Sequence, residues 1–160
     1  MSELLFNELP RPTFRWLRVN HTPASLLGES EETKSLLVKG NDAIISELPT
    51  GTALINPNYK GANDVALTQL VNSAEGYAVH VPANANEIVG IRIDAGARIA
   101  SRFQFIVEEG ANLEVQFFLD GGLANTTNVQ YFNEYDVKAN AKVVVKKVNL
   151  LDDTIQHIEH

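Results

Sequence analysis

The residues best suited to metal chemistry lie at the C-terminal end of the chain, in His157-Ile158-Glu159-His160. On a helix both histidines would share one face, where their imidazole nitrogens could bind one metal ion. On a strand His157 and Glu159 share a face, and His160 points the other way. The apolar pattern of residues 143–151 favours the strand, so we predict no metal site.

Two pairs of adjacent carboxylates, Asp152-Asp153 and Glu108-Glu109, supply the kind of acid that a glycosidase needs. Adjacent residues of a strand point to opposite faces, so neither pair can flank one glycosidic bond. We therefore predict that both pairs lie in solvated turns. His80 lies in an apolar segment, where we expect a packed or edge histidine.

Two further motifs have a structural interpretation. Gly121-Gly122 resembles part of a phosphate-binding loop, but the lysine and the following helix are missing, so it predicts a turn. Trp16 lies between Arg15 and Arg18 and could stack on a base, but a lone tryptophan more commonly contributes burial. We expect it to anchor the N-terminal segment.

The composition excludes several classes of function. The 160 residues include no cysteine, so the chain has no disulfide, no thiol nucleophile and no thiolate for zinc or an iron–sulfur cluster. Thirteen basic and twenty acidic residues give a net charge of −7, which disfavours nucleic acid as a partner. Apolar runs never exceed three residues, so we expect no membrane partner, no signal peptide and a cytoplasmic location. We predict no enzyme activity and no catalytic, cofactor-binding or metal residue.

The elements that must position these residues change character along the chain. Period-two alternation after Gly76 predicts half-buried strands. These strands cover residues 78–81, 88–93, 99–107, 113–119 and 143–151. A mainly β fold follows for this half of the chain.

The corners between the strands repeat. Ala97, Ala111 and Ala141 each lie beside Gly or Asn, and their separations of 14 and 30 residues indicate a repeat near fifteen. Such repetition is typical of a solenoid whose coils bury their apolar faces against each other, with about thirty residues in each coil. A sandwich or jelly roll also has strands at short intervals and remains an alternative.

The first 50 residues are irregular. Ser2 can cap a short helix that places Leu5 and Leu9 on one face, and Thr22-Pro23 reads as an N-cap followed by a first-turn proline. Two apolar runs on either side of Gly40-Asn41 predict a hairpin with positive φ angles at its turn.

Residues 48–51 predict a turn, and residues 64–74 predict a helix from their apolar spacing. We therefore divide the chain into a small irregular α+β region, residues 1–75, and a β region, residues 76–160.

Two stretches resemble the SufB/SufD family of iron–sulfur cluster assembly scaffolds. Residues 9–20 resemble the opening of short SufD-like proteins, and residues 66–82 resemble the helix, glycine and strand-Val-Pro passage that leads into the family's β-helix. The resemblance implies a flattened right-handed parallel β-helix and a non-enzymatic role. It also implies a SufB/SufD-type subunit and a SufC-type ATPase as partners of the full-length protein.

The resemblance carries no functional residue to this chain. Family members run to several hundred residues, and their SufC-binding segment and cluster-related Cys and His residues lie in C-terminal parts. We expect this chain to be the N-terminal part of such a protein or a short paralogue, with a cluster only in the family's full complex. Its final strand, residues 153–160, carries Ile155 and Ile158 without a proline or lysine, and we expect it to form a homodimer.

The alternative function is a carbohydrate-binding or carbohydrate-active β-solenoid. Tyr131 and Tyr135 lie four residues apart, hence on one strand face, and could form a sugar platform with Phe103 or Phe117. Inward-facing aromatic stacks would produce the same spacing. The two alternatives differ in whether these rings are exposed.

Overall fold

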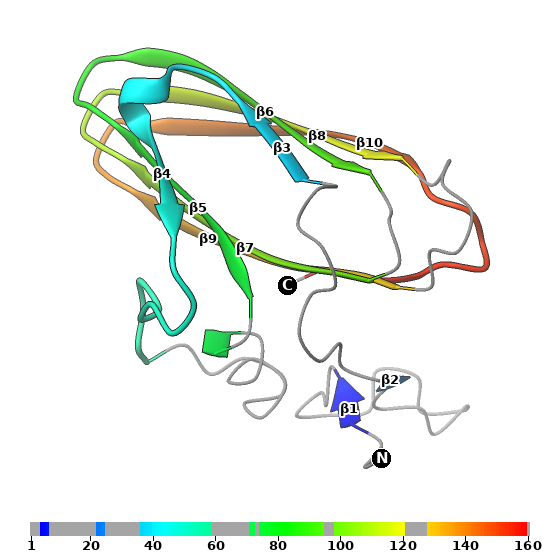
Figure 1. The fold of residues 1–160 in the computed structure, drawn as a ribbon. Helices are drawn as coiled ribbons and strands as arrows, with labels where there is room; N and C mark the ends of the chain where they lie inside the picture. The colour runs from blue at the N-terminus through cyan, green and yellow to red at the C-terminus, as the bar shows by residue number, and fades with distance from the viewer. Residues whose placement is uncertain are drawn as a thin grey trace, which may run out of the picture.

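The chain is mainly β, with two mostly parallel sheets that lie face to face (Figure 1). The computed structural model describes residues 4–6, 22–24, 36–58, 71–72, 74–94, 98–120 and 128–159. The first sheet has the order β10-β8-β6-β3, and the second has the order β11-β9-β7-β5-β4. The strands of the first sheet are β3 (Leu36–Lys39), β6 (Asn86–Asp94), β8 (Asn112–Asp120) and β10 (Lys142–Leu150). Those of the second are β4 (Ile45–Leu48), β5 (Glu75–Val81), β7 (Arg98–Val107), β9 (Asn128–Val137) and β11 (Gln156–Glu159).

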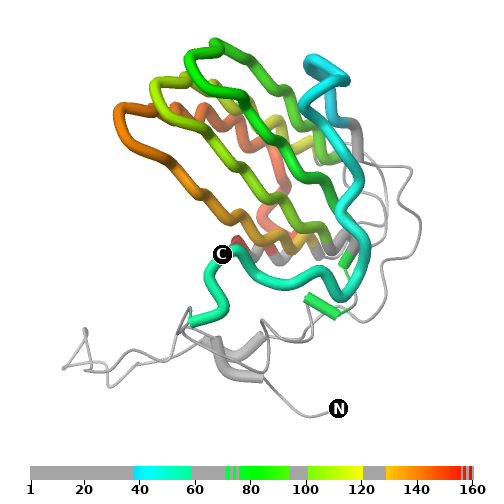
Figure 2. Tube along the Cα trace, turned by 90° about the vertical axis from the view of Figure 1, so that its left-hand side faces the viewer, coloured from blue at the N-terminus to red at the C-terminus, as the bar shows by residue number. Residues whose placement is uncertain are grey.

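From β5 onward the chain alternates between the two sheets, and each strand pairs in parallel with the next strand of its own sheet. Paired residues are 26 apart in β5–β7 and β6–β8, and 30 apart in β7–β9 and β8–β10. The five predicted strands are confirmed. The antiparallel pairing that a jelly roll requires is not found among β5 to β11. Figure 2 shows the result as a stack of strands in chain order, from cyan to orange.

The core lies between the sheets because alternate residues of every long strand point inward. Phe103 of β7, Phe117 of β8 and Tyr131 of β9 form a ladder of rings across the interior, with centroids 5.7 Å apart for Phe103–Phe117 and 5.5 Å apart for Phe117–Tyr131. All three rings are buried. The inward interpretation of the aromatic spacing is therefore confirmed, and an exposed sugar platform made from these rings is wrong.

The corners repeat as tight turns. Asn84, Gly110 and Asn140 have φ angles of +60°, +70° and +57°, the left-handed conformation that Gly and Asn tolerate best. An alanine follows each of them, and its amide N–H closes the turn at 3.1 Å from a carbonyl three residues earlier. Ala111 and Ala141 thus lie at corners, as predicted. Ala97 lies outside the described residues.

The predicted hairpin at Gly40-Asn41 is wrong. β3 pairs antiparallel with β6 in the first sheet, whereas β4 pairs antiparallel with β5 in the second. Asn41 caps a single 3-10 turn, Asp42–Ile44, which carries the chain from one sheet to the other. Gly40 allows the chain to pass close to β6, because a Cβ atom at this position would lie 3.2 Å from the carbonyl oxygen of Ile88.

The predicted starts of two short helices are also wrong. Leu5 and Thr22-Pro23 lie in strands, β1 (Leu4–Phe6) and β2 (Thr22–Ala24), which pair antiparallel. A two-stranded ribbon tolerates proline because one side of each strand needs no partner. Of the helix predicted for residues 64–74, Val71 and Asn72 are helical, and most of the rest lies outside the described residues.

Candidate functional site

The most distinctive surface of the molecule is the open end of the two sheets. Among the described residues, β10 pairs with β8 alone, and β11 covers β9 only from Asn128 to Tyr131. Three large hydrophobic side chains that face the interior consequently reach solvent, with exposed fractions of 39% for Tyr135, 43% for Val137 and 45% for Val145. Their exposed apolar atoms, with the free backbone groups of β10, make this end suited to contact with another β structure. We call it the open end.

A polar cluster lies at the open end, on the inward faces of β9, β10 and β11. Lys147 forms an ion pair with Glu159, and the side-chain amide of Asn133 donates to the other oxygen of Glu159 at 3.3 Å. The Lys147 ammonium lies 5.4 Å from the centre of the Tyr131 ring, and the His157 ring stacks on Tyr131 with centroids 5.5 Å apart. The cluster thus closes the aromatic ladder with one ion pair.

The environment keeps the aromatic groups of this cluster neutral. Burial lowers the pKa of His157, an effect that Glu159 opposes and Lys147 reinforces. Burial, with the nearby Glu159 carboxylate, raises the pKa of Tyr135 to about 12 and raises that of Tyr131 further. Near neutral pH these groups are uncharged, so the cluster contains a single charged pair, Lys147 with Glu159, next to neutral aromatic rings.

Two potential metal ligands of the cluster lie on one strand face. His157 and Glu159 share the inward face, as the strand interpretation predicted, and Lys147 and Asn133 each contact one oxygen of the Glu159 carboxylate. Within the part of the chain that the structure describes, no group of three His, Asp or Glu side chains is placed to hold a metal ion. His160 lies outside the described residues.

A second polar constellation lies on the outer face of the second sheet, where we did not expect one. Arg102 is fully buried and donates to Glu134 at 3.1 Å and to the carbonyl of Thr52 at 2.7 Å. Gln104 donates to the same carboxylate oxygen at 2.9 Å, and the amide of Ile55 donates to the other at 2.7 Å. The network attaches the segment around residues 52–55 to β7 and β9.

Sequence reasoning missed this network because alternation made Arg102 and Gln104 look like ordinary solvent-facing residues of a half-buried strand. Both oxygens of the Glu134 carboxylate accept hydrogen bonds from the chain itself. Arg102 and Glu134 therefore act as a structural tether between residues 52–55 and the second sheet.

The remaining residues singled out from the sequence lie on the surface or in turns where the structure describes them. His80 is exposed on the outer face of β5 and contacts Glu108 at 2.9 Å, so it lies outside the core. Glu108-Glu109 and Asp152-Asp153 lie in turns, as predicted. Trp16 and Gly121-Gly122 lie outside the described residues.

No helix in the described ranges is long and apolar enough to cross a membrane. Comparison with protein-family models, with curated proteins and with solved structures gave no match.

Proposed function

We propose that strands β5 to β11 are successive coils of a flattened right-handed parallel β-helix. Strict alternation between two sheets, spacings of 26 to 30 residues between paired strands and stacked corner turns support this architecture. The right hand follows from the strong preference of parallel crossovers for that hand. A crystal structure with left-handed crossovers would overturn it.

On this architecture we propose a non-enzymatic, cytoplasmic scaffold of the SufB/SufD type that takes part in iron–sulfur cluster assembly. The observation that carries the proposal is the combination of a filled interior with an open end. Ring and aliphatic side chains occupy the space between the sheets, so function is left to surfaces, and the open end offers unpaired strands to a protein partner. The passage that resembles the family, residues 66–82, includes β5 and ends at Pro82 directly after it.

The residues of this chain do not fit an iron–sulfur cluster as ligands. The sequence has no cysteine and therefore no thiolate, and both oxygens of Glu159 contact other side chains. Of the described histidines, His80 is exposed on the outer face of a sheet, whereas His157 faces inward against Tyr131. The cluster is therefore handled by the family's full complex, with a SufB/SufD-type subunit and a SufC-type ATPase as partners. This chain contributes protein contacts.

Two measurements on the purified chain follow. After anaerobic incubation with iron and sulfide, no visible chromophore should survive desalting. In a pull-down, the SufC-type ATPase should not be retained, because the resemblance places that contact in a C-terminal segment. A stoichiometric chromophore or a retained ATPase would contradict these assignments.

The role itself is tested in cells that make this protein. Deleting residues 76–160 should lower the activity of an iron–sulfur enzyme such as aconitase without changing its amount. A plasmid copy of the chain should restore that activity. Restoration should fail with Val145→Lys at the open end and succeed with Ile88→Lys, a control of similar exposure on the outer face of the first sheet. Unchanged aconitase activity in the deletion strain would refute the role.

The carbohydrate alternative loses its main support. Phe103, Phe117 and Tyr131 are interior residues, and Tyr135 stacks on buried Phe105 at 4.9 Å. No row of exposed rings therefore forms from the residues that suggested a sugar platform.

A further inference from the structure

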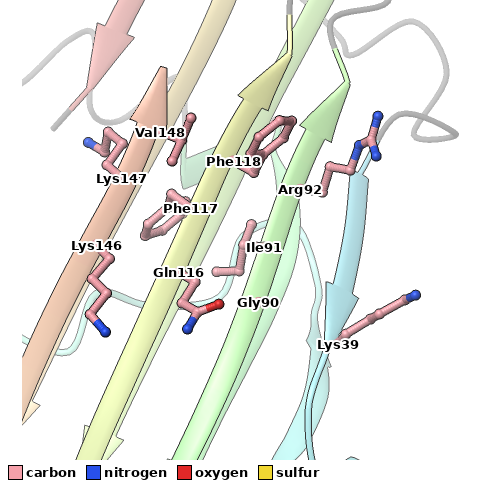
Figure 3. Close-up of a pocket in the computed structure, with 10 residues that line it drawn as sticks. All are labelled: Lys39, Gly90, Ile91, Arg92, Gln116, Phe117, Phe118, Lys146, Lys147 and Val148. Carbon is pink, nitrogen blue, oxygen red and sulfur yellow. The ribbon is translucent and has the colours of Figure 1, made fainter. Parts of the chain in front are cut away.

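A hollow of about 500 Å³ lies on the first sheet, between β3, β6, β8 and β10 (Figure 3). Gly90 of β6 lies within it. A Cβ atom added at Gly90 would have one heavy atom within 4 Å, the carbonyl oxygen of Lys39 at 3.9 Å. Space therefore remains above the strand, where any other residue would place a side chain. Phe118 and Val148 supply the apolar side chains of the outer face that border this space.

The charged residues that line the hollow are all cations, although the chain as a whole carries −7. One of the four, Lys147, points to the interior and pairs with Glu159. Lys39, Arg92 and Lys146 come from three different strands, and all three are exposed. Two of them have carboxylate neighbours outside the lining, Arg92 with Asp120 at 3.2 Å and Lys146 with Glu114 at 2.8 Å. Lys39 has no ion-pair partner among the described residues.

The Phe118 ring positions one of these cations. The Arg92 guanidinium carbon lies 5.5 Å from the centre of the Phe118 ring, a cation–π geometry that holds Arg92 over the apolar part of the hollow. An apolar group placed over Gly90 would contact Phe118, and a carboxylate next to it would reach Arg92 or Lys39. The hollow thus combines apolar contact with positive charge on an open surface.

We propose that this hollow binds a short extended acidic segment of a partner protein, with one apolar side chain over Gly90 and carboxylates at Lys39, Arg92 and Lys146. Charge complementarity favours an acidic partner, because the lining contains no carboxylate and Lys39 has no ion-pair partner among the described residues. An incoming carboxylate would share Arg92 with Asp120 and Lys146 with Glu114. A long polyanion such as nucleic acid would also meet the acidic remainder of the surface, whereas a short segment meets only the hollow. This contact goes beyond the assembly role proposed above and does not depend on it, because it uses the outer face of one sheet and leaves the open end free.

The probe is a short fluorescein-labelled peptide of alternating glutamate and leucine, and its anisotropy is followed as the full chain is added. The expected result is saturable binding that weakens as salt is raised. The same peptide with lysine in place of glutamate should not bind. In the amide NMR spectrum of the chain, the glutamate peptide should shift Gly90 and Gln116 most.

Variants locate the contact. Gly90→Val fills the hollow, and the open space above Gly90 means that the strand can accept it. Lys39→Glu reverses one lining charge. We expect each to weaken peptide binding about tenfold or more. Lys142→Glu, an exposed position on β10 outside the hollow, makes the same change of net charge and should leave binding within about twofold of the parent.

Several outcomes would overturn the proposal. Equal weakening by Lys39→Glu and Lys142→Glu would mean that net charge alone drives binding. Equal binding of the lysine peptide would remove the acidic specificity. Displacement of the peptide by millimolar inorganic phosphate would reassign the hollow to small anions. If Gly90→Val changes the circular dichroism spectrum, the Lys39→Glu comparison and the amide shifts still decide.

Discussion

We expect substitution of Glu134 to reduce stability strongly, because its carboxylate neutralises the fully buried Arg102. Glu134→Gln keeps the shape but leaves a buried cation without a counter-charge. Breaking a buried pair in this way costs about 3–5 kcal/mol, which urea unfolding would measure. Glu114→Gln, which disrupts the exposed pair with Lys146, should change stability little.

A further comparison separates charge from packing at Glu134. The double variant Arg102→Met with Glu134→Leu removes both charges, so it should recover much of the loss seen with Glu134→Gln. A double variant that is less stable than Glu134→Gln would show that the hydrogen bonds to residues 52–55 matter more than the uncompensated charge.

His157 gives the folded chain a predictable pH dependence. Because burial lowers its pKa, the unfolded chain binds a proton more readily than the folded chain. The free energy of unfolding should therefore decrease as pH falls below the ordinary histidine pKa of 6.5. The decrease should stop below the lowered pKa of His157 in the folded chain. His157→Phe keeps a ring against Tyr131 and should remove this part of the decrease. Urea titrations between about pH 8 and 5 would measure it, and an identical slope in the variant would contradict the assignment.

At the scale of elements, the stacked corners depend on residues that accept positive φ. Asn140 is exposed and has φ of +57°. Asn140→Ala should lower stability by about 1 kcal/mol, because the left-handed conformation is strained for alanine, whereas Asn140→Gly should be nearly neutral. Thermal unfolding compares the two at the same site. Equal effects would mean that the asparagine side chain matters more than the backbone conformation.

At the scale of the whole molecule, the open end makes self-association the expected behaviour. A two-fold dimer through β9, β10 and β11 would cover Tyr135, Val137 and Val145. The charge of −7 disfavours indefinite growth, so a closed dimer is expected in preference to a fibre. Sedimentation over a concentration series up to tens of micromolar would detect it.

The matched variants for this dimer are Val145→Lys and Ile88→Lys. Val145→Lys places a charge at the open end and should give a monomer. Ile88→Lys, which changes a side chain of 59% exposure on the outer sheet face, should still dimerise. A parent chain that remains monomeric throughout the series would refute the dimer.

The amino-acid sequence by itself determined the strands after Gly76, because period-two burial and turn residues are local signals. The same local signals placed Ala111 and Ala141 at corners and His157 and Glu159 on one strand face. Only the tertiary structure decided which residues distant in sequence contact each other. Gly76 lies in β5, where a Cβ would meet the Arg102 carbonyl oxygen of β7 at 1.7 Å. Gly40-Asn41, expected to close a hairpin, connects the two sheets. Arg102, on the polar face of a strand predicted to be half-buried, is fully buried and bonded to Thr52. Each of these outcomes depends on a partner 26 or more residues away in sequence, which no local pattern specifies.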